Sequence, residues 1–203
     1  MAKWPRFGSC KTRLSKDIGK NNALRIQKKM LNHTLSVSNY LKEKKIAEIS
    51  VAITGIGLNS SKRWCKDLGI NNFYFQGQGC LGEKMKRQLF KSRRDSRNFK
   101  EKNIIFIGTD LPNLSHMDIV KAISKLKKQD VILGPSNDGG YWLIGFSKGF
   151  ISKNNYLPFI NIKWSSNDVL KKTIDNLSQQ KIKIDFLNTK IDIDTLQDID
   201  QRG

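Results

Sequence analysis

Apolar residues recur along the chain at two spacings, one typical of helices and one typical of strands. Residues 21–44 are predicted to form an amphipathic helix, because Ala23, Ile26, Met30 and Leu41 stand mostly at helical spacing. The same kind of pattern predicts shorter helices at 61–68, 82–91, 115–128 and 165–180. A last short helix is expected to begin near Thr195, where Asp198 follows three residues later.

Short runs of β-branched and aromatic residues lie between these helices and predict strands. They cover residues 48–54, 72–76, 103–108, 130–134, 141–146 and 181–187. The run 103–108 is the most apolar, so we expect it to be central in a sheet covered on both faces.

The order of helices and strands predicts an α/β fold of three layers, with a mostly parallel sheet between helices. The 203 residues contain no repeat and no low-complexity linker, so a single domain over 1–203 is expected. Ligands in such folds bind beyond the carboxyl ends of the strands.

The chain is strongly basic, with 37 Lys and Arg against 18 Asp and Glu and a net charge of +19. Such an excess attracts polyanions. The basic residues are spread along the whole chain, and no zinc-finger spacing or aromatic RNA-binding strand accompanies them. These features argue against nucleic acid as the principal ligand, although a non-catalytic basic nucleic-acid binder stays an alternative.

The remaining composition points to a cytoplasmic protein. No apolar run reaches the roughly 18 residues that a membrane span needs, and the N-terminus lacks the apolar stretch of a secretory signal. Three cysteines without a C-x-x-C pair indicate neither a disulfide framework nor a zinc site.

Two groups of carboxylates are candidates for metal binding. Asp110 follows the predicted strand 103–108 directly, which presents it at the carboxyl edge of the sheet. Asp192 and Asp194 are two residues apart, so on an extended segment both would face one way. One or two carboxylates are enough to hold Mg²⁺ at a phosphate. Turn or capping roles would explain the same aspartates.

The opening segment offers a counterpart to these acids. Lys3, Arg6, Lys11 and Arg13 carry four positive charges without an intervening acid, on a chain that Pro5 and Gly8 bend. A diphosphate or triphosphate could engage them, with bidentate contacts from the arginines, and bridge to a metal at Asp110. A solvated, frayed terminus is the alternative.

Two further loops could approach a ligand. Gly77, Gly79 and Gly82 lie between a strand and a helix start, where backbone can come close to a phosphorylated ligand. Residues 137–140 join two predicted strands, and Asp138 there could orient or deprotonate an acceptor hydroxyl. An ordinary flexible loop and a plain hairpin turn explain these two segments equally well.

Taken together, five motifs resemble the radical-SAM/selenodomain-associated glycosyltransferases, a family also labelled arsenosugar-biosynthesis glycosyltransferases. They are "AKWPRFGSCKTRL", "QGCLGEKM", "GTDLPNL", "GPSNDGGYWLIGF" and "DIDTLQDI", in order from Ala2 to about Asp198. The resemblance implies a GT-A-like fold of the nucleotide-diphospho-sugar transferase superfamily, which also contains nucleotidyltransferases. It further implies an NTP or nucleotide-sugar substrate, a small-molecule acceptor and a Mg²⁺ or Mn²⁺ ion.

The resemblance also assigns roles to individual residues. The phosphate loop would contain Lys3, Pro5, Arg6, Gly8, Lys11 and Arg13, and the nucleoside loop Gly79, Gly82 and Glu83. The metal would be bound by Asp110, Asp192 and Asp194. The acceptor loop would comprise Asn137, Asp138, Gly139, Gly140 and Tyr141, with Asp138 and Lys11 as the catalytic residues.

Two features depart from the family pattern. Relatives have a hydrophobic strand before the first motif, whereas Met1 directly precedes Ala2 here, so the chain is expected to lack that strand. We therefore predict that the reading frame upstream of Met1 encodes an apolar run of about 5–6 residues, a usual strand length. The second departure is that Gly108-Thr109-Asp110 offers one aspartate rather than an Asp-x-Asp pair.

The resemblance, together with the basic and acidic candidates, implies a metal-dependent glycosyltransferase that uses a nucleotide sugar and a small-molecule acceptor. Cationic groups would neutralise charge on the leaving nucleoside diphosphate. The alternative is a nucleotidyltransferase that joins an NTP to a phosphorylated small molecule and releases pyrophosphate. The nucleotidyltransferases of the superfamily also have a single aspartate at this place. The basic excess fits this alternative slightly better, because both of its substrates are anionic.

Overall fold

The computed structural model describes residues 1–70, 72–95, 102–153 and 156–200. Contacts within the chain divide it into two compact units. Unit 1 comprises Met1–Phe75, Gly108–His116 and Ile191–Gly203, and unit 2 comprises Gln76–Ile107 and Met117–Lys190.

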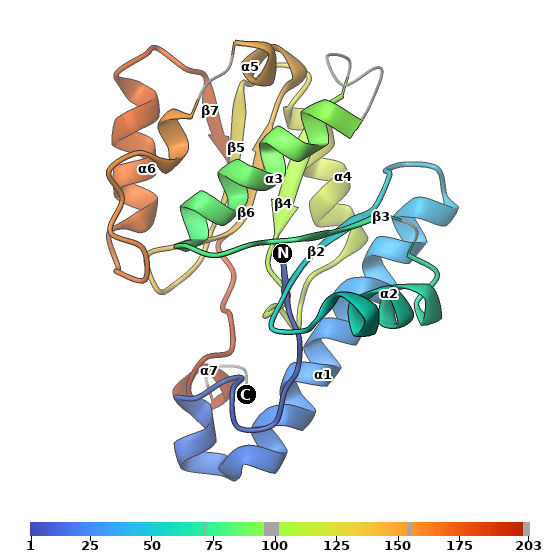
Figure 1. The fold of residues 1–203 in the computed structure, drawn as a ribbon. Coiled ribbons are helices and arrows are strands. Elements are labelled where there is room, and N and C mark those ends of the chain that lie inside the picture. The colour runs from blue at the N-terminus through green and yellow to red at the C-terminus, as the bar shows by residue number, and fades with distance from the viewer. Residues whose placement is uncertain (71, 96–101, 154–155, 201–203) are drawn as a thin grey trace. The chain divides into compact units, whose positions relative to one another are not determined.

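Helices and strands alternate along most of the chain (Figure 1). In chain order the elements are β1 (Ala2–Lys3), α1 (Leu14–Glu43), β2 (Ser50–Thr54), α2 (Leu58–Asp67), β3 (Asn72–Phe75), α3 (Leu81–Asp95), β4 (Ile104–Ile107), α4 (His116–Lys125), β5 (Val131–Pro135), β6 (Tyr141–Phe146), α5 (Lys148–Ser152), the 3₁₀ helix η2 (Leu157–Phe159), α6 (Val169–Ser178), β7 (Ile184–Phe186) and α7 (Gln197–Asp200).

Unit 1 is built on a parallel sheet in the order β1-β2-β3. Ala2 pairs with Ile53, and both are buried. Residues of α1, α2 and the sheet share one apolar core: Ala2, Leu31, Leu35, Val51, Ile53, Cys65 and Ile70. The parallel strands need the helices as crossovers, and the helices bury their apolar faces on the sheet in return.

The long helix α1 is interrupted near its start. Gly19 has φ 81° and ψ 156°, values that glycine adopts without a steric penalty, so residues 14–18 form a separate first turn. The remainder of α1 fixes the segment that follows β4. His33 Nε2 lies 2.8 Å from the carbonyl of Leu114, and the rings of Tyr40 and His116 are 4.6 Å apart.

Unit 2 contains a four-stranded sheet in the order β4-β6-β5-β7. Strand β6 is antiparallel to both of its neighbours, whereas β5 and β7 are parallel. Strand β5 is buried on both faces, because Val131, Ile132 and Leu133 are each 0% exposed. The sheet therefore lies inside the unit and not on its surface.

The two faces of β6 show how unit 2 is layered. Neighbouring strand residues point to opposite faces. Gly145 faces Leu126, which directly follows α4, while Phe146 stacks on Phe150 of α5 at 5.3 Å and packs against Phe159 of η2. Since η2 also contacts α3 and α6, unit 2 has helices on both sides of its sheet.

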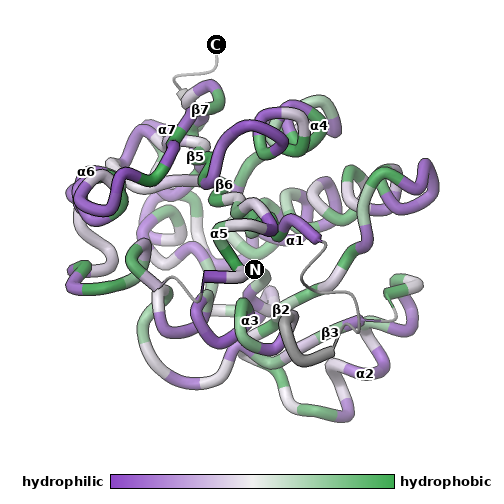
Figure 2. Tube along the Cα trace, turned by 90° about the horizontal axis from the view of Figure 1, so that it is seen from above, coloured by the Kyte–Doolittle hydropathy of each residue, from purple (hydrophilic) through white to green (hydrophobic). Residues whose placement is uncertain are grey.

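The predicted elements are largely confirmed. All the predicted strands and helices are present, most of them with shifted ends. Three of the strand pairs are parallel. Figure 2 shows that hydrophobic and hydrophilic residues alternate along the helices. The short α5 and η2 were not predicted. In the described segments, no helix is long and apolar enough to cross a membrane.

One expectation about the strands is corrected. Strand β4 lies at one end of its sheet and not at the centre, because among the described residues it pairs with β6 alone and its four residues are only partly buried. The first motif itself contributes a two-residue strand, because Ala2 and Lys3 make β1 and pair with β2. The apolar strand expected before Ala2 stays a prediction.

The aromatic core of unit 2 gives a stability prediction. Phe146 is fully buried among Phe106, Phe150 and Phe159, so we expect Phe146→Ala to lower the free energy of unfolding by about 3–5 kcal/mol. Urea unfolding followed by circular dichroism measures this loss. Phe186→Ala is the matched control, because Phe186 is 41% exposed and its removal should cost less than about 1 kcal/mol. Equal losses in the two variants would contradict the assigned core.

Candidate functional site

The segment between β1 and α1 forms a compact turn. The carbonyl of Arg6 accepts hydrogen bonds from Ser9 N at 3.2 Å and from Cys10 Sγ at 3.3 Å. Lys3 Nζ donates to the carbonyl of Ser9 at 2.5 Å. Gly8 has φ 72°, which permits this reversal. The opening segment is therefore held in a defined conformation by its own backbone.

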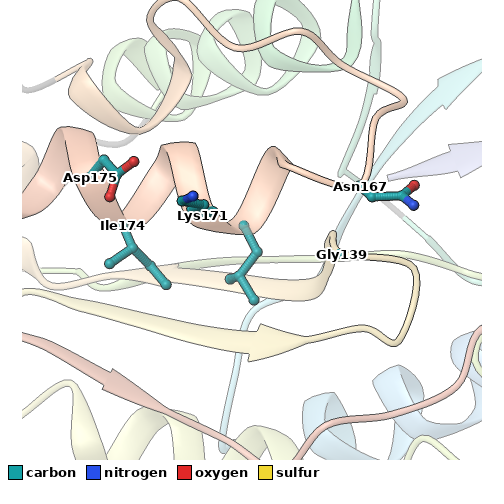
Figure 3. A pocket seen from close by; sticks show the side chains of 6 residues that line it. Gly139, Asn167, Lys171, Ile174 and Asp175 are labelled. Carbon is teal, nitrogen blue, oxygen red and sulfur yellow. The ribbon is translucent and has the colours of Figure 1, made fainter.

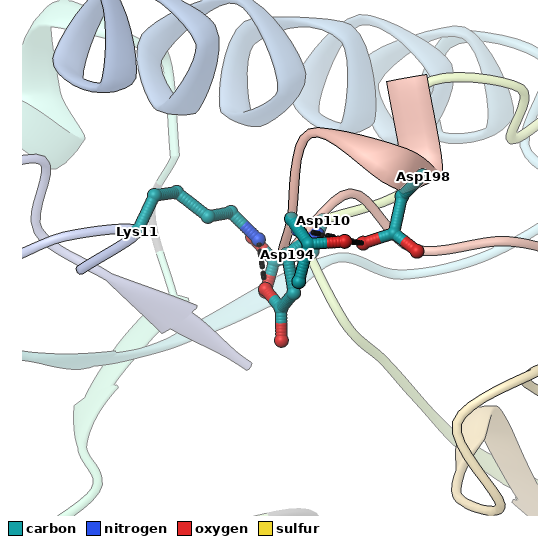
Figure 4. A network of polar contacts seen from close by, with 5 residues as sticks. Lys11, Asp110, Asp194 and Asp198 are labelled. Carbon is teal, nitrogen blue, oxygen red and sulfur yellow. Dashed lines mark hydrogen bonds and ion pairs between the residues drawn. The ribbon is translucent and has the colours of Figure 1, made fainter. Parts of the chain in front are cut away.

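Lys11 leaves this turn and reaches two carboxylates. Its Nζ lies 2.9 Å from Oδ1 of Asp110 and 2.7 Å from Oδ1 of Asp194 (Figure 4). The lysine side chain is 4% exposed, whereas the two aspartate side chains are 41% and 47% exposed. A buried cation therefore joins two acids that still have access to solvent.

The backbone of Lys11 lies in the left-handed region, with φ 48°. A residue with a side chain adopts that region at a cost of about 1–2 kcal/mol, so glycine or asparagine would be the ordinary choice. Strained residues of this kind cluster at binding and catalytic sites.

Electrostatics keeps Lys11 charged. Burial alone would lower the pKa of the ammonium, but the adjacent carboxylates of Asp110 and Asp194 outweigh burial and raise it above 10.5. The amino group of Met1 is also buried near Asp110. Burial lowers the pKa of that amino group to about 6, and the attraction of Asp110 opposes the shift only in part.

The C-terminal segment is fixed beside Asp110 by main-chain contacts. Ile193 N donates to the carbonyl of Asp110 at 3.2 Å. Oδ2 of Asp198 accepts from Asp194 N at 2.9 Å, from Thr195 N at 2.6 Å and from Thr195 Oγ1 at 2.8 Å. Asp198 thus caps the start of α7 as expected and holds Asp194 in place.

The same geometry bears on metal binding. Asp110 and Asp194 already hold one cation between them, and hard oxygen ligands are those that Mg²⁺ and Mn²⁺ prefer. Among the described residues, no group of three or more His, Cys, Asp or Glu side chains could hold a metal. Asp192, which is partly buried in the same segment, therefore does not complete a three-acid cluster with Asp110 and Asp194. The donor set fits an ion that takes its other ligands from phosphate and water.

The other basic residues of the opening segment face solvent. Lys3, Arg6 and Arg13 are exposed, and Arg13 directly precedes the first turn of α1. In the part of the chain that the structure describes, neither Arg6 nor Arg13 forms an ion pair. Both guanidinium groups are thus accessible to an anion in solution. Pro5 is partly buried in the same turn.

The glycine-rich segment before α3 belongs to unit 2 and is held by two side chains. Arg87 donates to the carbonyls of Gln76 and Gln78, the second at 2.9 Å. Glu83 Oε2 accepts from Cys80 N at 2.8 Å, and this hydrogen bond lowers the pKa of Glu83. The observed role of Glu83 is therefore to cap α3.

The glycines of this segment have close neighbours within the chain. Gly77 and Gly79 have φ 75° and 103°, and a Cβ at Gly79 would lie 2.1 Å from Oε2 of Glu83. Gly82 is buried at the first turn of α3, where the indole of Trp164 covers it. Contacts with Arg87, Glu83 and Trp164 thus hold the loop, while residues 77–81 are themselves exposed.

The predicted acceptor loop is the turn of the β5–β6 hairpin. Oδ1 of Asp138 accepts from Ser136 Oγ at 2.5 Å and from Gly140 N at 2.9 Å. Asn137 and Asp138 are exposed, and Gly139 has φ 82°. The hairpin interpretation is confirmed, and one Asp138 oxygen is committed to maintaining it.

Tyr141 begins β6 with its hydroxyl sealed from solvent, next to the hydroxyl of Thr173. Burial raises the pKa of the phenol far above its usual value, and Thr173 opposes this shift only in part. Tyr141 therefore stays neutral, and the rest of its ring is partly exposed.

A shallow depression lies between the hairpin turn and α6 (Figure 3). It is lined by Gly139, Asn167, Leu170, Lys171, Ile174 and Asp175. The depression is open and mostly apolar, and it contains none of the predicted phosphate or metal residues.

Three residues that hold the predicted ligand loops were not identified from the sequence. Trp164, Arg87 and Asn167 each hold a predicted ligand loop, yet none was singled out. Only Trp164 left a signal, as a large aromatic residue in a polar stretch before α6.

A family model described as "Uncharacterized protein conserved in bacteria (DUF2064)" matches residues 37–166. No curated protein sequence matches the chain.

Two solved structures are similar in fold. One, from Desulfovibrio desulfuricans G20, is provisionally described as a nucleotide-diphospho-sugar transferase; it has a TM-score of 0.86 and 26% identity over 98% of this chain and 81% of its own. The other is 4-diphosphocytidyl-2C-methyl-D-erythritol synthase from Anaerococcus prevotii DSM 20548, with a TM-score of 0.56 and 16% identity over 85% and 86% of the two chains. The predicted fold is thereby confirmed as that of nucleotide-diphospho-sugar transferases.

The cap at Asp198 gives a pH-dependent prediction. Burial raises the pKa of Asp198, but hydrogen bonds from Asp194 and Thr195 outweigh it and lower the pKa below 3.8. A lowered carboxyl pKa stabilises the native state above the unfolded value, and this contribution is lost as pH falls through the native pKa. Asp198→Ala should therefore lower the free energy of unfolding by about 1–2 kcal/mol at pH 7. The difference in unfolding free energy between variant and wild type should narrow below about pH 4.

Urea titrations between pH 7 and pH 3 measure the difference between variant and wild type. Asp198→Asn is the control, because it keeps an acceptor oxygen without the charge and should lose less at pH 7. If the difference in unfolding free energy between wild type and Asp198→Ala stays constant down to pH 3, the cap does not depend on the charge of Asp198.

Proposed function

The chain belongs to the DUF2064 family, and from this premise and its fold we propose that it is a nucleotide-dependent transferase. The leading form of the proposal is a metal-dependent glycosyltransferase that moves a sugar from a nucleotide sugar to a small-molecule acceptor. The 26% identical structure provisionally described as a nucleotide-diphospho-sugar transferase supports this form.

One observation carries the proposal. The cation of the opening segment and the acid that follows β4 are 99 positions apart in sequence, yet Lys11 and Asp110 form an ion pair of 2.9 Å. Arg6 and Arg13 belong to the same opening segment and face solvent. Basic groups beside a hard-oxygen cation site form an arrangement suited to the phosphates of a nucleotide.

The residues that would hold the metal are Asp110 and Asp194. A divalent cation bound there would supply neutralisation of charge on the phosphate oxygens. Asp192 stays a candidate ligand on sequence grounds only. The small number of protein ligands matches Mg²⁺ sites that complete their coordination with phosphate and water.

The basic residues would bind the phosphates themselves. The guanidinium groups of Arg6 and Arg13 can make paired hydrogen bonds to phosphate oxygens. Lys11 keeps its proton, so it can donate to a leaving phosphate once a competing cation takes its place at the carboxylates. Gly79, Gly82 and Glu83 stay the predicted nucleoside loop.

Asp138 is the proposed group for orienting or deprotonating the acceptor. Its Oδ1 is committed to the hairpin turn, while Oδ2 forms no hydrogen bond within the described residues. A carboxylate oxygen free on an exposed turn can accept a hydrogen bond from a hydroxyl.

The second candidate is a nucleotidyltransferase that releases pyrophosphate. The single aspartate of Gly108-Thr109-Asp110 and the net charge of +19 favour it. Incubation with NTPs and a phosphorylated acceptor pool, and separately with nucleotide sugars, distinguishes the two forms. Pyrophosphate release supports nucleotidyl transfer, whereas nucleoside diphosphate release supports glycosyl transfer.

The link to radical-SAM-associated arsenosugar glycosyltransferases is the finest level of the proposal and rests on the five sequence motifs. A cytoplasmic setting belongs to the proposal as well, and the free Cys10, Cys65 and Cys80 are compatible with a reducing compartment.

Removal of the central acid gives the decisive prediction. Thermal unfolding of wild type with UDP-glucose, GDP-mannose or single NTPs should show a rise in Tm that requires Mn²⁺. A ligand present at 100 times its Kd adds about 2.7 kcal/mol to the free energy of unfolding. Asp110→Ala should lose the Mn²⁺-dependent part of the rise. Asp185→Ala is the matched control, because it removes an ion-paired aspartate from β7, outside unit 1. A full Mn²⁺-dependent rise in Asp110→Ala would overturn the metal assignment.

Lys11 gives a separate prediction. Its ammonium and a divalent cation compete for Asp110 and Asp194, so Lys11→Met should bind Mn²⁺ more tightly than wild type without nucleotide, by about tenfold. The same variant should bind nucleotide phosphates more weakly. Electron paramagnetic resonance titration of free Mn²⁺ measures the first effect. Lys125→Met, which breaks an exposed ion pair in unit 2, should leave Mn²⁺ binding unchanged.

A further inference from the structure

A short segment before α6 contacts both predicted ligand loops of unit 2. We call residues 163–168 the strap. We propose that Trp164 of the strap is a positioning residue that couples the glycine loop, residues 77–82, to the hairpin turn, residues 137–141. The ligand roles of the two loops rest on the proposed function, whereas the coupling itself does not.

The first contact of the strap is with the glycine loop. A Cβ built on Gly82 would lie 2.4–2.5 Å from three atoms of the Trp164 indole. Such distances are far below van der Waals contact, so the indole lies directly on the backbone of the first turn of α3. Glycine at position 82 is therefore needed for the tryptophan to reach this place.

The second contact is with the hairpin turn. The rings of Trp164 and Tyr141 meet edge to face, with centroids 6.5 Å apart and planes at 83°. At the other end of the strap, a Cβ on Gly139 would lie 2.0 Å from the carbonyl oxygen of Asn167 (Figure 3 shows both residues). Leu170 N donates to the carbonyl of Gly139 at 2.8 Å.

The strap is fixed between these contacts. Ser166 Oγ donates to the carbonyl of Lys163 at 2.7 Å, and Ser165 has φ 65°. The strap leads into α6, where the buried Thr173 neighbours the hydroxyl of Tyr141. A displacement of one loop must therefore move Trp164 or lose its packing, which transmits the displacement to the other loop.

Trp142 shows that this is more than ordinary core packing. It also covers a glycine, Gly134, but it is 4% exposed, and the glycine and the tryptophan lie on adjacent, paired strands of one sheet. Trp164 is only partly buried, and it joins two segments that no strand pairing links within the described part of the chain. Its position suits the coupling of loops and not the filling of a core.

Hydrogen–deuterium exchange of the free protein tests the coupling without any ligand. In Trp164→Ala, amides of 77–82 and 137–141 should exchange at least about tenfold faster than in wild type. Trp164→Phe keeps an aromatic ring and should recover most of the protection. Trp64→Ala is the matched control, because it removes a partly buried tryptophan from α2 and should leave both loops unchanged.

A ligand arm connects the coupling to function. The probe is whichever of UDP-glucose, GDP-mannose and the four NTPs, each with MnCl₂, raises the wild-type Tm most. In wild type this nucleotide should slow hydrogen–deuterium exchange of the amides in both loops. In Trp164→Ala the nucleotide should bind about tenfold more weakly, and protection should no longer reach both loops together.

The outcomes separate the two proposals. If no probe binds wild type but Trp164→Ala loosens both loops, the coupling stands and the proposed function fails. If nucleotides bind and Trp164→Ala loosens one loop only or neither, the coupling is overturned and the proposed function stands. Faster exchange in both loops of Trp64→Ala would also overturn the coupling, because the effect would then be a general destabilisation of the protein.

Discussion

The ammonium of Lys11 between two carboxylates is the interaction on which the organisation of unit 1 depends. It joins the opening segment, the residue after β4 and the C-terminal segment at one point. A lysine buried without partners would tend to lose its proton, or its side chain would move out to solvent. Because Asp110 and Asp194 remain partly solvated, they hold the charge of Lys11 while keeping oxygen surface for a further ligand. The pair of acids is thus both a structural anchor and a candidate binding site.

Much of this arrangement was accessible from sequence, because its causes are local. Helical spacing located α1, α3 and α6, and β-branched runs located β2, β5 and β6. The position of Asp110 directly after an apolar strand indicated the edge where ligands collect, and the basic opening segment indicated an anion. Their meeting was a hypothesis that the 2.9 Å ion pair of Lys11 and Asp110 now supports geometrically. The Thr195–Asp198 cap was found in the same way, since its signal spans only three residues.

What sequence did not reveal depends on distant contacts. Strand β4 is the most apolar run, yet its place at the end of its sheet is decided by which strands pair, and hydrophobicity does not encode pairing order. The glycines were interpreted as places where a ligand approaches. The structure adds an intrachain reason for each, because Arg87, Glu83 and Trp164 occupy the space that side chains at 77, 79 and 82 would need. None of these partners can be identified from the spacing of glycines alone.

The break in α1 at Gly19 has a mechanical consequence. The first turn, which begins with Leu14, packs with Met30 and Ile193 in a small apolar cluster apart from the main core of unit 1. A single backbone joint thus separates the end that carries the basic segment from the rod that supports the sheet. If the basic segment binds the proposed phosphates, a change at the Gly19 joint would let that segment move without a matching change in the sheet. Helix α1 therefore has two parts with different tasks: the first turn anchors the basic segment through Leu14, and the remainder covers the sheet through Leu31 and Leu35.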